Sequence, residues 1–330
     1  MFLRNNSTVP YGTFEKNNLS NILTFSFFAS FHLLVWFKVD GIMEESQTKN
    51  ESELEDGIKK VSEERNDLEE KVLALLPDLK EELGEASSGV SDATLCKYLY
   101  WKQDVKRASE RFLSFVEWRK DNPLIYDDVP LKISADPMLE KMLGSDIVIS
   151  PESLVSKEEG STVLLFRLRN NDRSDGRTAE NICRMVFYMM DRVLERPRTL
   201  HNGVVVVHDM NHLSRANMDR RVVKILPKAL FGHLPIAIKA VYILNAPTFF
   251  KVIFTMISKL AFSSKMKDRI HFITNLEELH EKVDRDLLLV EHGGKLEFCS
   301  QQWTEEQKQR ELQEECTMES LTDCIPTSKF

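Results

Sequence analysis

The 330-residue chain lacks the features that mark several large functional classes. Lys and Arg number 44 against 52 Asp and Glu, which gives a formal net charge of −8. The chain therefore lacks the excess of positive charge with which proteins neutralise nucleic-acid phosphates. Its five cysteines are widely spaced and include no CxxC pair, so neither a disulfide framework nor a structural zinc site is expected.

The phosphate-binding and nucleophile motifs of α/β enzymes are also missing, namely GxGxxG, GxxxxGK[ST] and GxSxG. His208 and His212 stand four residues apart, but they straddle the end of a strand predicted over 203–209, and no Glu follows the first. Asp209 at the same strand end is either a catalytic acid or a cap for the following turn, and capping is favoured because no partner base or nucleophile accompanies it. We expect no enzyme activity, no metal and no cofactor.

What is present begins with an apolar run near the N-terminus. Residues 22–39 read ILTFSFFASFHLLVWFKV, a length at the lower limit for a membrane-spanning helix. Three interpretations stay open: an upstream extension without folded structure before a start at Met43, a membrane anchor, or a signal peptide. Residues 1–57 as a whole are predicted to be a poorly ordered extension.

Residues 58–135 are predicted to form a small, all-helical lobe. Apolar residues recur at helical spacing over 58–83, and Pro77 is expected to kink or divide that helix. Further helices are predicted over 95–99 and 105–120.

Residues 136–298 show a different pattern, in which short β-branched runs alternate with helical stretches. Strands are predicted over 162–168, 203–209, 238–244 and 269–274, and helices over 178–194, 217–231 and 248–262. This alternation implies crossover connections, so the fold class is α/β with a mainly parallel sheet flanked by helices. Residues 299–330 are predicted to be a polar, solvated C-terminal tail.

The helix at 248–262 is the most unusual element. Its polar residues fall on one narrow arc, and the rest of its circumference is apolar, whereas an ordinary surface helix has only one apolar stripe. It is either a fully buried core helix or a helix with two apolar partners, a ligand cavity inside and a bilayer outside. The cations Lys265, Lys267 and Arg269 just beyond it either face anionic headgroups or form a solvated helix end.

Several motifs occur in the order typical of one known family. They are Leu95-Cys-Lys-Tyr-Leu99 with Glu117-Trp-Arg119, Gly203-Val-Val-Val-Val-His-Asp209, Leu234-Pro235 with Tyr242-Ile-Leu-Asn-Ala-Pro247, Lys265-Met-Lys-Asp-Arg-Ile-His271 and Glu291-His-Gly-Gly294. Over roughly residues 73–298 the chain resembles the CRAL-TRIO lipid-transfer proteins, especially the branch that contains alpha-tocopherol transfer protein, cellular retinaldehyde-binding protein and the clavesins.

The resemblance implies a sheet that floors a hydrophobic pocket for one tocopherol-, retinoid- or phospholipid-like lipid, with helix 248–262 as a mobile gate. The implied pocket residues are Val186, Met190, Val204, His208, Leu213, Leu226, Leu230, Ile238, Val241, Ile253 and Ile257. The implied gate residues are Phe249, Phe250 and Phe254, and the implied phosphoinositide contacts are Lys239, Lys265, Lys267 and Arg269.

The implied protein is cytoplasmic and associates reversibly with membranes to transfer lipid. The alternative is a membrane-tethered, phosphoinositide-binding interaction module without transfer activity. Two departures bear on the ligand. Val186 and Met190 stand where the tocopherol protein has hydroxyl side chains, which favours an apolar or differently oriented ligand. Ala237 replaces a basic residue at a phosphoinositide-contacting position.

Overall fold

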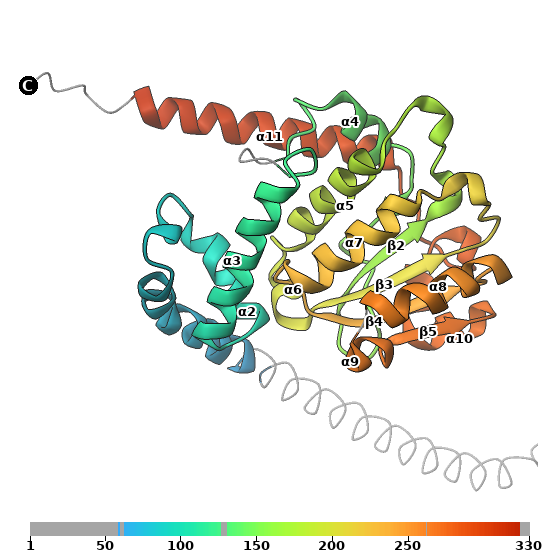
Figure 1. Ribbon diagram of the computed structural model, residues 1–330, viewed down its shortest axis with the longest axis horizontal. Helices are drawn as coiled ribbons and strands as arrows, with labels where there is room; N and C mark the ends of the chain where they lie inside the picture. The colour runs from blue at the N-terminus through green and yellow to red at the C-terminus, as the bar shows by residue number, and fades with distance from the viewer. Residues whose placement is uncertain (1–58, 60–62, 127–130, 262, 324–330) are drawn as a thin grey trace, which may run out of the picture. The chain divides into compact units, whose positions relative to one another are not determined.

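A computed structural model describes residue 59 and residues 63–126, 131–261 and 263–323 (Figure 1). The chain divides into two compact units, Met1–Asn66 and Asp67–Phe330, and nearly all of the described residues belong to the second. The apolar segment 22–39 and its three interpretations lie outside the described residues. Within the described ranges, no helix is both long enough and apolar enough to cross a membrane.

The second unit begins with a helical lobe. A helix runs through residues 67–83 and is followed by the 3₁₀-helix η1 (Gly84–Ser87), α2 (Asp92–Trp101) and α3 (Val105–Asp121). Leucines and aromatic side chains from all three helices form one buried cluster. Ser91 and Asp104 start α2 and α3 by accepting hydrogen bonds from the backbone N–H groups of Thr94 and Arg107.

Pro77 does not divide the first helix, which corrects one alternative of the prediction. A proline inside a helix removes one backbone hydrogen bond and crowds the preceding turn. Here Val72, Leu76, Leu79 and Leu83 are all buried in the lobe's core, so packing on both sides of Pro77 holds the helix together.

The α/β part has a five-stranded sheet of order β1-β2-β3-β4-β5 (Figure 1). Strands β2 (Thr162–Arg167), β3 (Val204–Asp209), β4 (Ile238–Leu244) and β5 (Ile270–Ile273) are parallel, which confirms the predicted fold class. The two-residue strand β1 (Val148–Ile149) is antiparallel to β2 and was not predicted, because so short a strand leaves no periodicity to detect.

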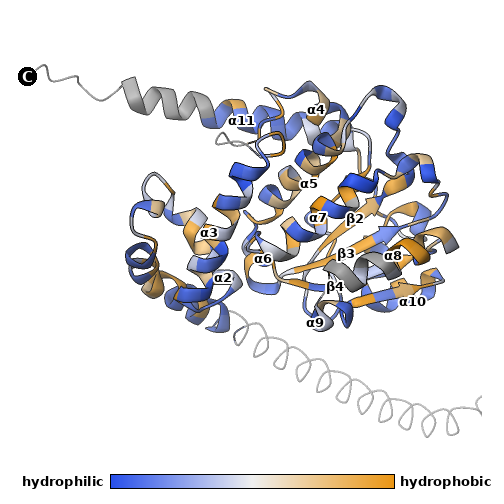
Figure 2. Ribbon diagram, in the orientation of Figure 1, coloured by the Kyte–Doolittle hydropathy of each residue, from blue (hydrophilic) through white to orange (hydrophobic). Residues whose placement is uncertain are grey.

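Both faces of the sheet are covered by other parts of the chain. The unbroken valine run of β3 is typical of a strand that is buried on both sides, and the strands are coloured largely hydrophobic in Figure 2. Successive side chains of a strand point to opposite faces. One face packs with α5 (Ala179–Val193), α7 (Arg220–Gly232) and α8 (Thr248–Ala261), and the other with α10 (Leu276–Lys282) and the segment that follows it. The helices α5 and α7 lie side by side over the first face (Figure 1). The short helices α4 (Pro137–Leu143), α6 (Pro197–Asn202) and α9 (Ser264–Lys267) connect these layers.

The polar C-terminal segment is helical up to Asp323, and most of its described side chains are exposed, although a few are buried. It forms α11 (Ser300–Asp323), which lies along α4 (Figure 1). Glu311 of α11 is only 5% exposed. Its Oε1 accepts a hydrogen bond of 2.7 Å from the Tyr188 hydroxyl, and its Oε2 accepts one of 2.9 Å from the Ile133 backbone N–H. These donors come from distant parts of the chain, so the polar sequence of α11 does not reveal that it packs.

Candidate ligand-binding site

An apolar cavity of about 220 Å³ lies between the sheet and the helices α5, α7 and α8. The strands supply its floor, α5 and α7 supply two walls, and two phenylalanines of α8 supply a third. Its lining comprises Ile147, Phe166, Leu168, Asn171, Ile182, Met185, Val186, Met190, Val206, His208, Met210, Met218, Val222, Leu226, Pro227, Leu230, Ile236, Ile238, Val241, Ile243, Phe250, Phe254 and Ile270. An apolar cavity on the order of 150 Å³ already stays dry and takes up small apolar molecules.

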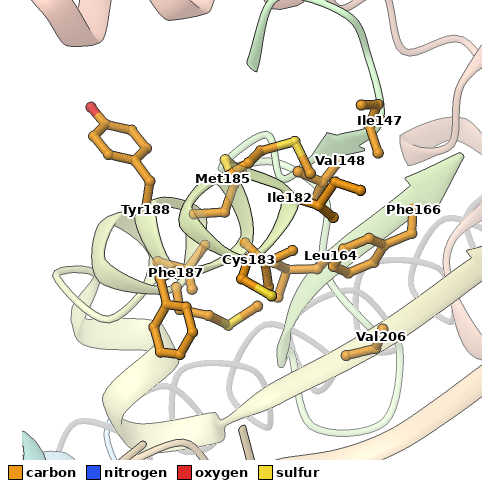
Figure 3. Packing of buried hydrophobic residues seen from close by; sticks show 14 of the residues in the cluster. Ile147, Val148, Leu164, Phe166, Ile182, Cys183, Met185, Phe187, Tyr188 and Val206 are labelled. Carbon is orange, nitrogen blue, oxygen red and sulfur yellow. The ribbon is translucent and has the colours of Figure 1, made fainter. Parts of the chain in front are cut away.

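The wall formed by α5 is positioned by its cap and its apolar face. Thr178 begins the helix in a capping box, since its hydroxyl accepts from the Asn181 N–H and the Asn181 side chain accepts from the Thr178 N–H. Figure 3 shows Ile182 and Cys183 against Leu164 and Phe166 of β2, while Tyr188 points away from the sheet. One face of α5 therefore closes the cavity, and the opposite side reaches α11 through Tyr188 and Glu311.

Seven of the eleven residues predicted for the pocket line this cavity: Val186, Met190, His208, Leu226, Leu230, Ile238 and Val241. Their contact with a lipid stays a prediction.

Three of the other four do not line the cavity, and the fourth is not described. Val204 and Leu213 belong to the same buried cluster but are not part of the lining, because Val204 begins β3 and Leu213 follows its end. Ile253 is half-buried on α8 and does not line the cavity. The Ile257 side chain lies outside the described residues.

Sequence reasoning missed several lining residues, including Phe166 and Val206 on the strands and Ile182 and Met185 on α5. Strand alternation was an available signal for Val206, because it shares a face of β3 with His208. Phe166 is likewise the direct register partner of His208 on β2.

The helix α8 is not a fully buried core helix, so that alternative is wrong. Phe250 and Phe254 line the cavity, whereas Val252 between them is 57% exposed. Phe249 packs against the same core, with the Arg215 guanidinium 5.7 Å from its ring centroid. Phe254 also contacts Phe272 of β5 edge to face, with ring centroids 5.1 Å apart. The helix thus has one face on the cavity and another in solvent.

Only two of the lining residues in the described part of the chain, Asn171 and His208, carry nitrogen or oxygen in their side chains. The Asn171 amide donates to the Asn217 carbonyl and accepts from Arg177. The His208 ring packs against Phe166, with centroids 4.8 Å apart, and its Nδ1 is buried with no hydrogen-bond partner in the described part of the chain. Burial lowers the pKa of His208 to about 4, so the imidazole is neutral near pH 7.

Asp209 caps the turn after β3, because its Oδ1 accepts a 2.9 Å hydrogen bond from the Asn211 N–H. It also belongs to a buried cluster that the sequence did not reveal. Its Oδ2 accepts from Arg169 Nη1 at 2.5 Å and lies 3.1 Å from His292 Nε2. Burial alone raises the pKa of Asp209, but the hydrogen bonds from His292 and Arg169 outweigh it and hold that pKa at about 2.

The carboxylates of Asp209 and Glu291 and the His292 imidazole lie close enough together to ligate a cation. However, Arg169 pairs with both carboxylates at 2.5 Å, so a guanidinium already supplies the positive charge there. His208 and His212 do not form a joint site either, since His208 lines the cavity and His212 is exposed.

The four cations predicted to contact a phosphoinositide differ in their surroundings. Lys239 Nζ lies 2.6 Å from Glu159 Oε2, and Arg269 Nη1 donates to the Ile238 carbonyl. Lys265 and Lys267 are exposed and form no ion pair among the residues that the structure describes. The structure therefore leaves these two lysines available to an anionic surface.

Comparisons with known proteins identify the domain that holds this cavity. The family model of the CRAL/TRIO domain matches residues 155–294. Human tyrosine-protein phosphatase non-receptor type 9 is 29% identical over 204 residues, which is 61% of this chain and 32% of that protein. The chain thus spans about a third of the phosphatase.

Human alpha-tocopherol transfer protein-like is 28% identical over 251 residues, 71% of this chain and 69% of that protein. The crystal structure of Sfh5 aligns with a TM-score of 0.43 and 15% identity over 66% of this chain and 83% of that one. Residues 155–294 of this chain are thus similar to the CRAL/TRIO domain, and the wider chain is similar to alpha-tocopherol transfer protein-like.

Proposed function

We propose that the chain binds one hydrophobic lipid in the cavity and transfers it between membranes, with α8 as a mobile gate. The observation that carries the proposal is an apolar cavity that α8 lines with Phe250 and Phe254, while Val252 of the same helix is exposed. The match of residues 155–294 to the CRAL/TRIO domain supports it, as does the similarity to a protein named for tocopherol transfer. Among the described residues, the lining includes no carboxylate, cysteine, lysine or hydroxyl, and this favours binding over catalysis.

The energetics explain why a gate is needed. A lipid that hides ~400 Å² of apolar surface gains on the order of 10 kcal/mol gross at about 25 cal/mol per Å². Its release into water therefore has a high barrier, which falls if the cavity opens directly onto a bilayer. A helix with apolar residues on both sides finds an apolar environment whether it covers the cavity or lies in the membrane interface.

The arrangement of α8 fits this movement. Phe250 and Phe254 lie on the cavity side, and Val252 is exposed on the outer side of the helix. The helix is linked to the rest of the fold mainly through α7 and β5. We infer that the outer residues enter the interface first and that the phenylalanines follow as the lipid leaves.

We further propose that Lys265 and Lys267 orient this edge toward anionic lipid, phosphoinositides included, in a protein that is cytoplasmic and binds membranes reversibly. Each cation near such a surface contributes about 1 kcal/mol. Lys239 could contact an anionic lipid only after its ion pair with Glu159 breaks, and Arg269 only after its hydrogen bond to the Ile238 carbonyl breaks.

Transfer of a fluorescent lipid between two vesicle populations tests the gate. Val252→Asp places a charge on the outer face of α8 without altering the lining, so transfer should fall about ten-fold or more while lipid binding in solution stays unchanged. Val290→Asp is the matched control, because Val290 is 65% exposed on a different element. Equal transfer rates for the two variants would overturn the gate assignment.

A further inference from the structure

We propose that His208 is a hydrogen-bonding anchor inside the cavity, and that the bound lipid is uncharged and presents a single hydroxyl group to this imidazole. This inference rests on the proposed lipid-binding function and deepens it. It names the chemical class of the ligand and the residue that selects it.

Polar side chains are rare in the lining of the cavity. Asn171 and His208 are the only described lining residues with nitrogen or oxygen in the side chain. Asn171 is already used within the protein, since its Nδ2 donates to the Asn217 carbonyl at 2.7 Å and its Oδ1 accepts from Arg177 at 3.3 Å. That leaves one polar side chain for a ligand.

The imidazole of His208 has unused hydrogen-bonding capacity. Its Nδ1 is buried and has no hydrogen-bond partner among the described residues. The ring lies on the cavity wall beside Phe166 and opposite Ile243 of β4. Buried polar groups are rarely left unpaired, because desolvation without a replacement hydrogen bond costs free energy. An unpaired imidazole in an apolar cavity therefore indicates a group that the ligand supplies.

The group that the ligand supplies is uncharged. The lining residues within the described ranges bear no ionised side chain, and burial keeps His208 neutral near pH 7. The nearest carboxylate in the sequence, Asp209, points to the opposite face of the sheet and is paired with Arg169 and His292. A carboxylate or phosphate inside the cavity would lose its hydration without gaining a counter-ion.

A hydroxyl is the group that suits a neutral imidazole. A neutral imidazole carries one N–H donor and one unprotonated acceptor nitrogen. A hydroxyl group donates and accepts, so it matches either nitrogen, while its hydrocarbon remainder suits the lining. A site built around one buried polar group also rejects an otherwise identical ligand that lacks the matching group.

Three lipids of equal chain length test the proposal: 1-hexadecanol, hexadecane and palmitate, each delivered from cyclodextrin to the full chain and counted by native mass spectrometry. We expect the wild-type chain to bind the alcohol about ten-fold or more tightly than the other two. His208→Phe should bring the alcohol and the alkane to equal affinity, and His208→Gln should retain part of the preference.

His271→Phe is the control, because His271 is an exposed histidine on β5 outside the lining. Circular dichroism and thermal unfolding establish that each variant is folded. Should His208→Phe keep the wild-type preference for the alcohol, or the wild-type chain bind palmitate or hexadecane as tightly, the anchor assignment is overturned. If the wild-type chain takes up none of the three lipids, the proposed function itself is overturned.

Discussion

His292 Nε2 lies 3.1 Å from Asp209 Oδ2, and both side chains are only 2% exposed. Asp209 ends the central strand β3, and His292 lies in the short 3₁₀-helix η6 (Val290–His292), 83 residues further along the chain. Arg169 after β2 completes the contact. This cluster joins the closing segment of the domain to the carboxyl end of the sheet, on the face opposite the cavity.

Removing the carboxylate should destabilise the fold strongly. Asp209→Ala leaves Arg169 and His292 without their buried partner, and breaking a buried pair in this way costs about 3–5 kcal/mol. Urea unfolding measures the loss. Asp286→Ala removes an exposed carboxylate that pairs with the exposed Lys295, and this control should cost at most about 0.5 kcal/mol. Equal losses in the two variants would show that the cluster contributes no more than a surface pair.

The buried imidazole of His208 predicts a dependence of stability on pH. Its pKa is about 4 in the folded chain, against an ordinary value of 6.5. Between these two values the unfolded chain binds a proton that the folded chain does not. The free energy of unfolding should therefore fall as the pH is lowered, by about 2 kcal/mol between pH 7 and pH 5 from this group.

The comparison of wild type with His208→Phe isolates that contribution. Urea unfolding at pH 7 and pH 5 should show a smaller loss in the variant, because phenylalanine does not titrate. The same pH dependence in both proteins would mean that His208 is protonated as readily in the fold as in the unfolded chain.

The contact of Glu311 with Tyr188 and Ile133 predicts that this buried carboxylate is one of the main contacts that hold α11 on the domain. Glu311→Ala should leave the Tyr188 hydroxyl and the Ile133 N–H unpaired and speed amide hydrogen exchange throughout α11 by about ten-fold or more. Glu314→Ala on the exposed side of the same helix is the matched control. The prediction is wrong if exchange in α11 is the same in both variants.

Gly294, the last residue of the Glu291-His-Gly-Gly294 motif, predicts a steric effect. A Cβ atom there would overlap the carbonyl oxygens of Leu288 and Arg285. Gly294→Ala should therefore cost about 3 kcal/mol or more of unfolding free energy. Gly232→Ala at the end of α7 has open space around the new methyl group and should be neutral or stabilise by up to about 1 kcal/mol. A loss no larger for Gly294→Ala would contradict the close packing at this motif.

The elements that the sequence predicted well are those whose signal is local. The valine run of β3 and the long apolar faces of α5 and α7 depend on their own residues, and the structure has them within a few positions of the predicted bounds. The seven predicted residues that line the cavity lie on α5, α7 and the strands. They were predicted from the family resemblance, which itself rests on motifs in these elements.

The features that escaped prediction all depend on pairing across the fold. Nothing near Asp209 signals that Arg169 and His292 converge on it. In the sequence, Glu311 is one of several acidic residues in a polar helix. Only the fold shows that its hydrogen-bond partners come from α5 and from the residues before α4. The sequence also does not show that His208 Nδ1 is unpaired. Strand alternation predicts the sheet face to which the His208 side chain points, but not whether a neighbouring residue forms a hydrogen bond with it.

Native mass spectrometry of the full chain, incubated with vesicles made from a total cellular lipid extract, tests most directly whether the cavity holds a lipid. The wild-type chain should carry one lipid per molecule. Leu230→Trp, which fills the cavity from α7, should carry none while its circular dichroism spectrum is unchanged. A wild-type chain that emerges without lipid, or a folded Leu230→Trp variant with the same lipid occupancy, would contradict the account.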